Sequence, residues 1–224
     1  MMNPVVIAVD GTAASGKGTL ARRLAQDFGF AHLDSGSLYR LVALKLLRSG
    51  HHPGDEQSAT KAALAIDPSD ARRHDLRADE LAEAASILAA FPRVRSALLD
   101  YQRAFAATPP AGAPGAVIDG RDIGTVVCPR ATAKLFVDAQ QHVRAHRRWL
   151  ELEESGRVVS EEAVLADICA RDQRDRLRET APLRPAADAS LLDTSELDID
   201  AAFAAALALV SPRVEEALRT CHRG

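Results

Sequence analysis

A glycine-rich loop near the N-terminus limits what this chain can fold into more than any other feature. The loop follows a short apolar, β-branched run at residues 5–9 and precedes residues 19–28, where Leu20, Leu24 and Phe28 recur at four-residue spacing before Gly29. A buried strand, a glycine-rich loop and an amphipathic helix in this order are typical of a parallel α/β sheet. The loop itself reads Gly11, Thr12, Ala13, Ala14, Ser15, Gly16, Lys17, Gly18 and Thr19.

The spacing of the two glycines and the lysine, G-x-x-x-x-G-K, predicts that the loop binds phosphate groups. Glycines let the backbone turn its N–H groups toward an anion, and the helix start adds its positive dipole end. Lys17 adds a full charge that can reach the terminal phosphates. Gly18 replaces the usual Ser or Thr after the lysine, so a magnesium ion would meet Thr19 directly or through water. The alternative is an ordinary glycine-rich turn.

The remaining pattern predicts one α/β domain over residues 1–224, with a five-stranded parallel sheet flanked by helices. Further strands are expected at residues 30–33, 116–118, 134–137 and 191–192, all short apolar runs. Helices are expected at residues 37–47, 56–66, 78–90, 92–107, 139–153 and 160–178, and from Asp198, whose side chain can cap the last one. The helical block at residues 37–108 reads as an insert between the second and third strands.

Composition restricts the partners. Lys plus Arg number 28 against 31 Asp plus Glu, a net charge of −3, so no general attraction to nucleic acid or to an anionic membrane is expected. Aromatic residues make up only 4 %, too few for base stacking. Cys128, Cys169 and Cys221 are far apart and the N-terminus lacks a signal peptide, which favours a reducing cytoplasm. The seven histidines form no recognisable metal set.

Two short polar segments follow predicted strands and could hold a second anion at the carboxyl edge of the sheet. In the first, Ser35 can donate to a phosphate or a sugar, and Arg40 can hold a phosphate through two hydrogen bonds. In the second, Asp119 and Asp122 flank Arg121. The alternatives are a capping serine with a surface arginine, and a solvated turn.

Arginines gather in the last third of the chain. Only four basic residues are lysines, so 24 of the 28 are arginines, and eight of these lie between Arg144 and Arg178. Arg144 and Arg148 share one helix face, and Arg171, Arg174 and Arg178 share another beyond Gly156. Two such helices joined by a glycine-containing loop predict a lid over residues 144–171 that closes on phosphates, with solvated helix faces as the alternative.

Taken together, the segments GTAASGKGTLARRLA, LDSGSLYRLVAL, VIDGRDIGTVVCP and RDQRDRLRETAPLRPAAD resemble bacterial cytidylate kinases. That family belongs to the nucleoside-monophosphate kinase group of P-loop kinases, and the resemblance covers nearly the whole chain. It implies in-line transfer of the γ-phosphoryl group of ATP, with Mg²⁺, to CMP or dCMP. It also implies a cytoplasmic monomer, with residues 37–108 as the acceptor-binding insert.

Carried over residue by residue, the resemblance assigns Gly11 to Thr19 to ATP, with Mg²⁺ held mainly by ATP. The acceptor nucleotide would be surrounded by Ser35, Arg40, Ser86, Arg95, Asp119, Arg121, Asp122, Arg171, Asp175 and Arg178. The residues implied in catalysis are Lys17, Arg121, Arg144, Arg148 and Arg178. Transfer would need no general base, because the acceptor phosphate is already ionised near pH 7.

The chain departs from the family's usual pattern at residues 67–79, where the acceptor-binding insert is shortened, so discrimination of base and deoxyribose could be looser. Two other functions remain open at this point. One is a kinase on the same scaffold that takes UMP or another small acceptor. The other is an ATP-binding sensor without transfer.

Overall fold

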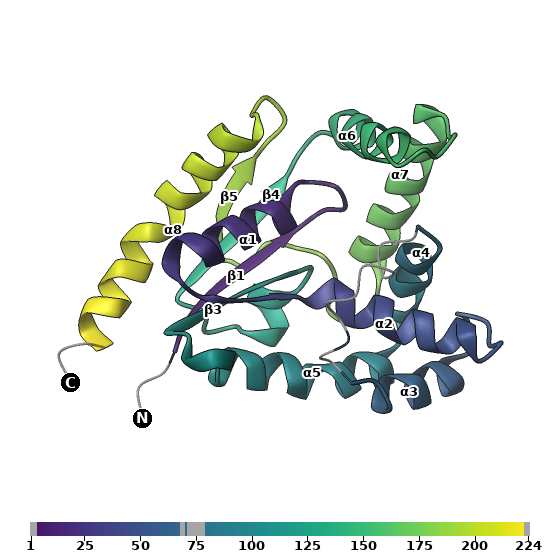
Figure 1. The fold of residues 1–224 in the computed structure, drawn as a ribbon, viewed down its shortest axis with the longest axis horizontal. Helices are drawn as coiled ribbons and strands as arrows, with labels where there is room; N and C mark the ends of the chain where they lie inside the picture. The colour runs from purple at the N-terminus through teal and green to yellow at the C-terminus, as the bar shows by residue number, and fades with distance from the viewer. Residues whose placement is uncertain (1–3, 68–69, 71–78, 222–224) are drawn as a thin grey trace.

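The computed structural model describes residues 4–67, 70 and 79–221 and has a parallel five-stranded sheet covered by helices (Figure 1). The strand order is β2-β3-β1-β4-β5. The strands are β1 (Val5–Gly11), β2 (Ala31–Asp34), β3 (Gly115–Gly120), β4 (Ala133–Asp138) and β5 (Ser190–Asp193). The predicted α/β class, strand number and parallel direction are confirmed.

Helices form the rest of the structure. They are α1 (Lys17–Phe28), α2 (Ser35–Arg48), α3 (Glu56–Leu64), α4 (Asp79–Leu88), α5 (Pro92–Ala107), α6 (Gln141–Glu154), α7 (Glu161–Leu177) and α8 (Ile199–Cys221). Two shorter turns are η3 (Pro110–Gly112), a 3-10 turn, and η4 (Ile123–Val127), a π-helical turn. Within the described ranges, no helix is both long and apolar enough to cross a membrane.

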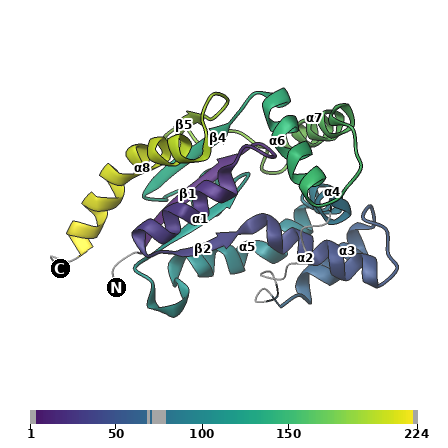
Figure 2. The same cartoon turned by 45° about the horizontal axis from the view of Figure 1, so that its top comes forward.

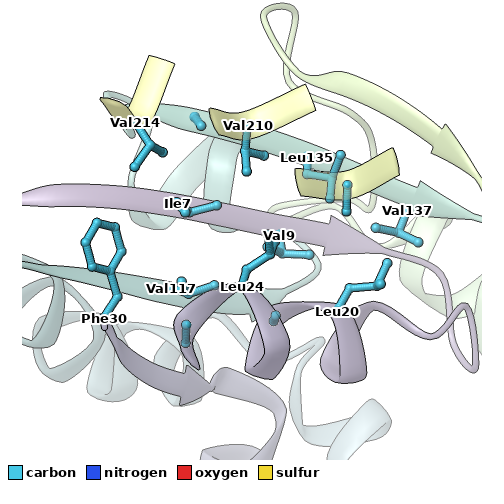
Figure 3. Packing of buried hydrophobic residues seen from close by; sticks show 14 of the residues in the cluster. Ile7, Val9, Leu20, Leu24, Phe30, Val117, Leu135, Val137, Val210 and Val214 are labelled. Carbon is cyan, nitrogen blue, oxygen red and sulfur yellow. The ribbon is translucent and has the colours of Figure 1, made fainter. Parts of the chain in front are cut away.

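The central strand β1 carries apolar side chains on both faces because both faces of the sheet are covered. On one face, Ile7 and Val9 pack with α1 and α8, as Figure 3 shows. On the other face, Val6 and Ala8 pack against residues of α5 and η4. All seven residues of β1 are buried, so the strand that leads into the phosphate loop has fixed surroundings.

Helices α2 to α5 form a second apolar core at one side of the sheet (Figures 1 and 2). Leu38, Val42, Leu88 and Leu98 are almost fully buried in it. Helices α6 and α7 pack together through a smaller cluster that includes Leu152 and Ile168. Both helical groups lie toward the end of the sheet where β1 enters the phosphate loop.

Element boundaries differ from the predicted ones by a few residues, and η4 was not predicted. Helix α2 begins at Ser35 because Asp34 caps it, its carboxylate accepting from the Ser37 N–H at 3.1 Å. The Asp198 carboxylate accepts from the Ala201 N–H at 2.8 Å, as expected for the start of α8. The shortened segment at residues 67–79 lies mostly outside the described residues.

Candidate functional site

The phosphate loop runs from the end of β1 to the start of α1 and depends on glycines at two places. A Cβ on Gly11 would lie 2.0 Å from the carbonyl oxygen of Val137 on β4, so no larger residue fits. Gly16 has a φ of 84°, in the left-handed region that favours glycine, and it is followed directly by α1. The loop therefore approaches the sheet closely and then turns so that the N–H groups of the helix start remain available to an anion.

Lys17 stands at the first position of α1 and is kept close to the loop. Its Nζ donates to the carbonyl oxygen of Thr12 at 3.1 Å. Burial and the positive charges of Arg121 and Arg171 lower the pKa of Lys17 to about 7, against the opposing effect of Asp119 and Asp34. A polyanion bound here would restore the charged form.

Arg144 lies behind the phosphate loop and is only 1 % exposed. Its guanidinium donates to the carbonyl oxygens of Ala13 at 2.9 Å and Ala139 at 2.7 Å, and pairs with Asp172 of α7 at 2.6 Å. It thus joins α6, α7 and the loop. Arg148, one turn further along α6, is partly exposed and pairs with Glu151 at 2.9 Å.

A second group of charged residues lies at the carboxyl ends of β2 and β3. Asp34 pairs with Arg40 at 2.5 Å, and Asp119 lies 2.8 Å from His32 Nε2. Arg40 keeps the pKa of the Asp34 carboxyl below its usual value, although burial alone would raise it. Ser35 comes close to the β3 terminus, where a Cβ on Gly120 would meet its Oγ at 2.5 Å.

Helices α5 and α7 and the turn after β3 supply the rest of this cluster. Arg95 of α5 pairs with Asp122, and Arg121 pairs with Asp175 of α7 at 2.8 Å. Arg178, just beyond α7, lies 3.7 Å from Asp122 and 4.0 Å from Asp175. The pKa of Asp175 is lowered by Arg121 and Arg171, against its burial. Residues separated by up to 83 positions thus form one network of alternating charge.

Several buried polar atoms at this site have no hydrogen-bond partner within the protein. The donors are Arg40 Nε, Ser86 Oγ, Arg171 Nε, Arg174 Nε and Arg178 Nη2. Buried donors are nearly always satisfied in folded proteins, so a group of them indicates a missing acceptor. Burial lowers the pKa of Arg171 to about 10, assisted by the neighbouring charge of Arg121. An anion rich in oxygen atoms would satisfy both the donors and the charge.

The structure places the predicted residues in two groups. The loop residues Gly11 to Thr19 lie around the start of α1. The predicted acceptor residues lie on α2, α4, α5, β3 and α7, in the turn after β3, and directly after α7. Their assignment to particular substrates stays a prediction. Sequence reasoning missed Asp10 and His32. Asp10 immediately precedes the glycine loop, which was a readable signal. Arg174 was placed on one helix face with Arg171 and Arg178 but was not assigned to a substrate.

Side chains alone do not form a metal site in the part of the chain that the structure describes. There, no three His, Cys, Asp or Glu side chains are grouped closely enough to hold a metal ion. Thr19 lies in the first turn of α1, and its Oγ1 accepts from Arg22 at 3.2 Å. A magnesium ion would therefore need phosphate oxygens for most of its ligands.

The match to known proteins decides the family. The family model described as cytidylate kinase matches residues 7–211, which span both the phosphate loop and the charged network. The chain belongs to the cytidylate kinase family. This kinase family uses ATP, in agreement with the glycine loop.

Cytidylate kinases from three bacteria illustrate the similarity. The chain is 57 % identical to that of Paramagnetospirillum magneticum, over 93 % of this chain and 98 % of the relative. It is 55 % identical to the cytidylate kinase of Nitrobacter winogradskyi, over 92 % of this chain and 95 % of the relative. It is 51 % identical to that of Rhodospirillum rubrum, over 95 % of this chain and 100 % of the relative. The chain thus corresponds to nearly the full length of each relative.

Solved structures share the fold at low sequence identity. An uncharacterized protein from Eubacterium ventriosum aligns with a TM-score of 0.53 at 13 % identity, over 92 % of this chain and 98 % of that chain. At this level of identity the alignment supports the α/β fold alone.

Proposed function

We propose that this cytidylate kinase transfers the γ-phosphoryl group of ATP to CMP or dCMP, giving ADP and the corresponding diphosphate. The observation that carries the proposal is the set of buried donors on Arg40, Ser86 and Arg171 that have no hydrogen-bond partner within the protein. Arg171 is close enough to Lys17 for its charge to lower the Lys17 pKa, and Arg40 pairs with Asp34, whose charge also acts on Lys17. An acceptor phosphate held by these arginines would therefore approach the terminal phosphate of ATP. The relatives at 51–57 % identity support the same acceptor class.

On the donor side, the loop N–H groups and the start of α1 would bind the ATP phosphates. Lys17 would leave the Thr12 carbonyl and contact the terminal phosphates, because a phosphate is a stronger acceptor than a neutral carbonyl. Magnesium, held by ATP phosphates and Thr19, would supply charge neutralisation at the transferring group. Transfer is then mainly a matter of alignment and electrostatic stabilisation.

On the acceptor side, the network offers both donors and acceptors. Arg40 and Arg171 carry buried free donors suited to the phosphate. The base and the sugar would lie nearer Asp122, Asp175 and Arg121. The two carboxylates can accept from amine and hydroxyl groups, and the guanidinium can donate to carbonyl and hydroxyl oxygens. The acceptor phosphate is already ionised near pH 7, so it attacks in line without a general base.

The two helical groups would have separate roles in substrate binding and in closure of the site. Residues 37–108 would form the acceptor-binding insert, and residues 144–171 would form the lid that excludes water. Arg148 is partly exposed and pairs with Glu151 at 2.9 Å, so it would have to exchange this surface pair for phosphate oxygens when the lid closes. Arg144 would have to exchange Asp172 for a phosphate oxygen when the lid closes.

We propose further that the enzyme acts as a monomer in the cytoplasm. Both groups of site residues come from one chain, and Cys128 and Cys169 are free thiols, which fits a reducing compartment.

The test is coupled ADP release from Mg·ATP with CMP, dCMP, UMP and AMP at equal concentrations, with Lys17→Ala as the control. Turnover concentrated on CMP and dCMP supports the proposal. Equal turnover on UMP would indicate a broader pyrimidine kinase and would place base discrimination in the shortened segment. Tight ATP binding without turnover on any acceptor would support a sensor instead.

A further inference from the structure

Asp10 carries a buried carboxylate at the end of β1, next to the phosphate loop but directed away from it. Its Oδ1 accepts from the Ile123 N–H at 2.7 Å, and its Oδ2 accepts from the Gly124 N–H at 2.7 Å. Both oxygens are therefore bonded to the first residues of η4. Two backbone N–H groups bonded to one side chain hold η4 against β1, most strongly when the carboxyl group is ionised.

The turn η4 directly follows residues of the charged network. Asp122 immediately precedes it and pairs with Arg95 and Arg178, while Arg121 pairs with Asp175. A displacement of η4 would therefore move Arg121 and Asp122 together. The position of this turn sets where the network stands relative to the phosphate loop.

The far end of η4 is held as well. Arg103 of α5 donates from Nη2 to the carbonyl oxygen of Val126 at 3.1 Å and from Nε to that of Val127 at 3.3 Å. One end of the turn is thus bonded to the strand that leads into the phosphate loop. The other end is bonded to a helix of the block at residues 37–108.

The anchor on β1 is rigid. Asp10 lies opposite Gly120 on β3 and Phe136 on β4, and the next residue, Gly11, is confined by the Val137 carbonyl. Burial raises the pKa of Asp10 to about 7, against the two backbone hydrogen bonds that lower it.

We propose that Asp10 is a positioning residue for acceptor binding, which sets the distance between Lys17 and the pair Arg121–Asp122 by bonding η4 to β1. The inference rests on the proposed function. Asp10 touches neither nucleotide in this arrangement and acts through the backbone of Ile123 and Gly124.

The test is Asp10→Asn, which keeps the shape but replaces one acceptor oxygen with an NH₂ group that faces an N–H donor. We expect the KM for CMP to rise about tenfold or more, while the KM for ATP changes by less than about threefold, because only the acceptor network loses its anchor. A purely structural role would lower the melting temperature without separating the two KM values. Asp198→Asn is the matched control, since it alters a carboxylate that accepts a backbone N–H at the start of α8.

A second variant covers the case in which Asp10→Asn does not fold. Arg103→Met frees the other end of η4 and should raise the KM for CMP about threefold with the KM for ATP unchanged. Equal changes in both KM values, or no change, would overturn the inference while the wild type still phosphorylates CMP. A wild type that does not phosphorylate CMP would instead refute the proposed function.

Discussion

Lys17 should take up a proton when ATP binds. Without phosphate its pKa is lowered to about 7 by burial and by Arg121 and Arg171. Bound phosphates offset both effects and return the pKa to the ordinary range near 10.4. Well above pH 7 and below about pH 10, binding therefore converts a largely neutral amine into an ammonium.

The magnitude follows from the two pKa values. At pH 8 the free side chain is about 9 % protonated and the bound one nearly fully, so about 0.9 proton is taken up per ATP. At pH 6 the free side chain is already about 91 % protonated, and uptake falls to about 0.1 proton. The sign is an uptake in both cases, because the charged form is favoured in the complex.

The assay is titration calorimetry with Mg·ATP, without acceptor, in buffers of different ionisation enthalpy at pH 6 and pH 8. Lys17→Arg is the matched control because its guanidinium stays charged throughout. Subtracting the proton uptake of this variant from that of the wild type removes the protons that come from ATP. As a second readout, the affinity of the wild type for Mg·ATP should fall about tenfold between pH 8 and pH 9, where ATP is fully ionised. The expectation would be refuted if wild type and Lys17→Arg took up the same number of protons at pH 8. It would also be refuted if the wild type took up equally many protons at pH 6 and pH 8.

Three further outcomes are expected. Arg148→Ala should lower kcat by about 10³ or more, because it would remove a cation that contacts the transferring phosphoryl group. A loss of kcat below about tenfold in steady-state assays would show that Arg148 has no catalytic role. Gly11→Ala should lower the free energy of unfolding by about 3 kcal/mol or more in denaturant titrations, because its Cβ would lie 2.0 Å from the Val137 carbonyl. Gly18→Ala, whose Cβ would lie 3.6 Å from Asp119, is the control and should cost far less. Arg171→Met should lower kcat/KM for CMP by about a hundredfold with ATP affinity retained, and unchanged CMP kinetics would show that its free donor does not meet the acceptor.

Local patterns were sufficient to predict the order of the elements. The apolar run at residues 5–9 and the glycine loop predicted β1 and α1, because both depend on neighbours in the sequence. The turn η4 escaped prediction because its π-helical shape depends on distant groups: Asp10 binds its first N–H groups and Arg103 its last carbonyls. No property of residues 123–127 alone specifies those partners.

The candidate site likewise has one part that short sequence segments predict and another that only the tertiary structure decides. The sequence by itself determined the phosphate loop and the class of fold, since their chemistry and spacing are written in short segments. The residues around the acceptor were assigned from the family resemblance, and that assignment stays a prediction. The tertiary structure alone decided the pairing of Arg121 with Asp175 and of Arg144 with Asp172, and the clustering of unpartnered donors. The pKa values of Lys17 and Asp10 were also decided there, because burial and charges brought together from distant segments set them.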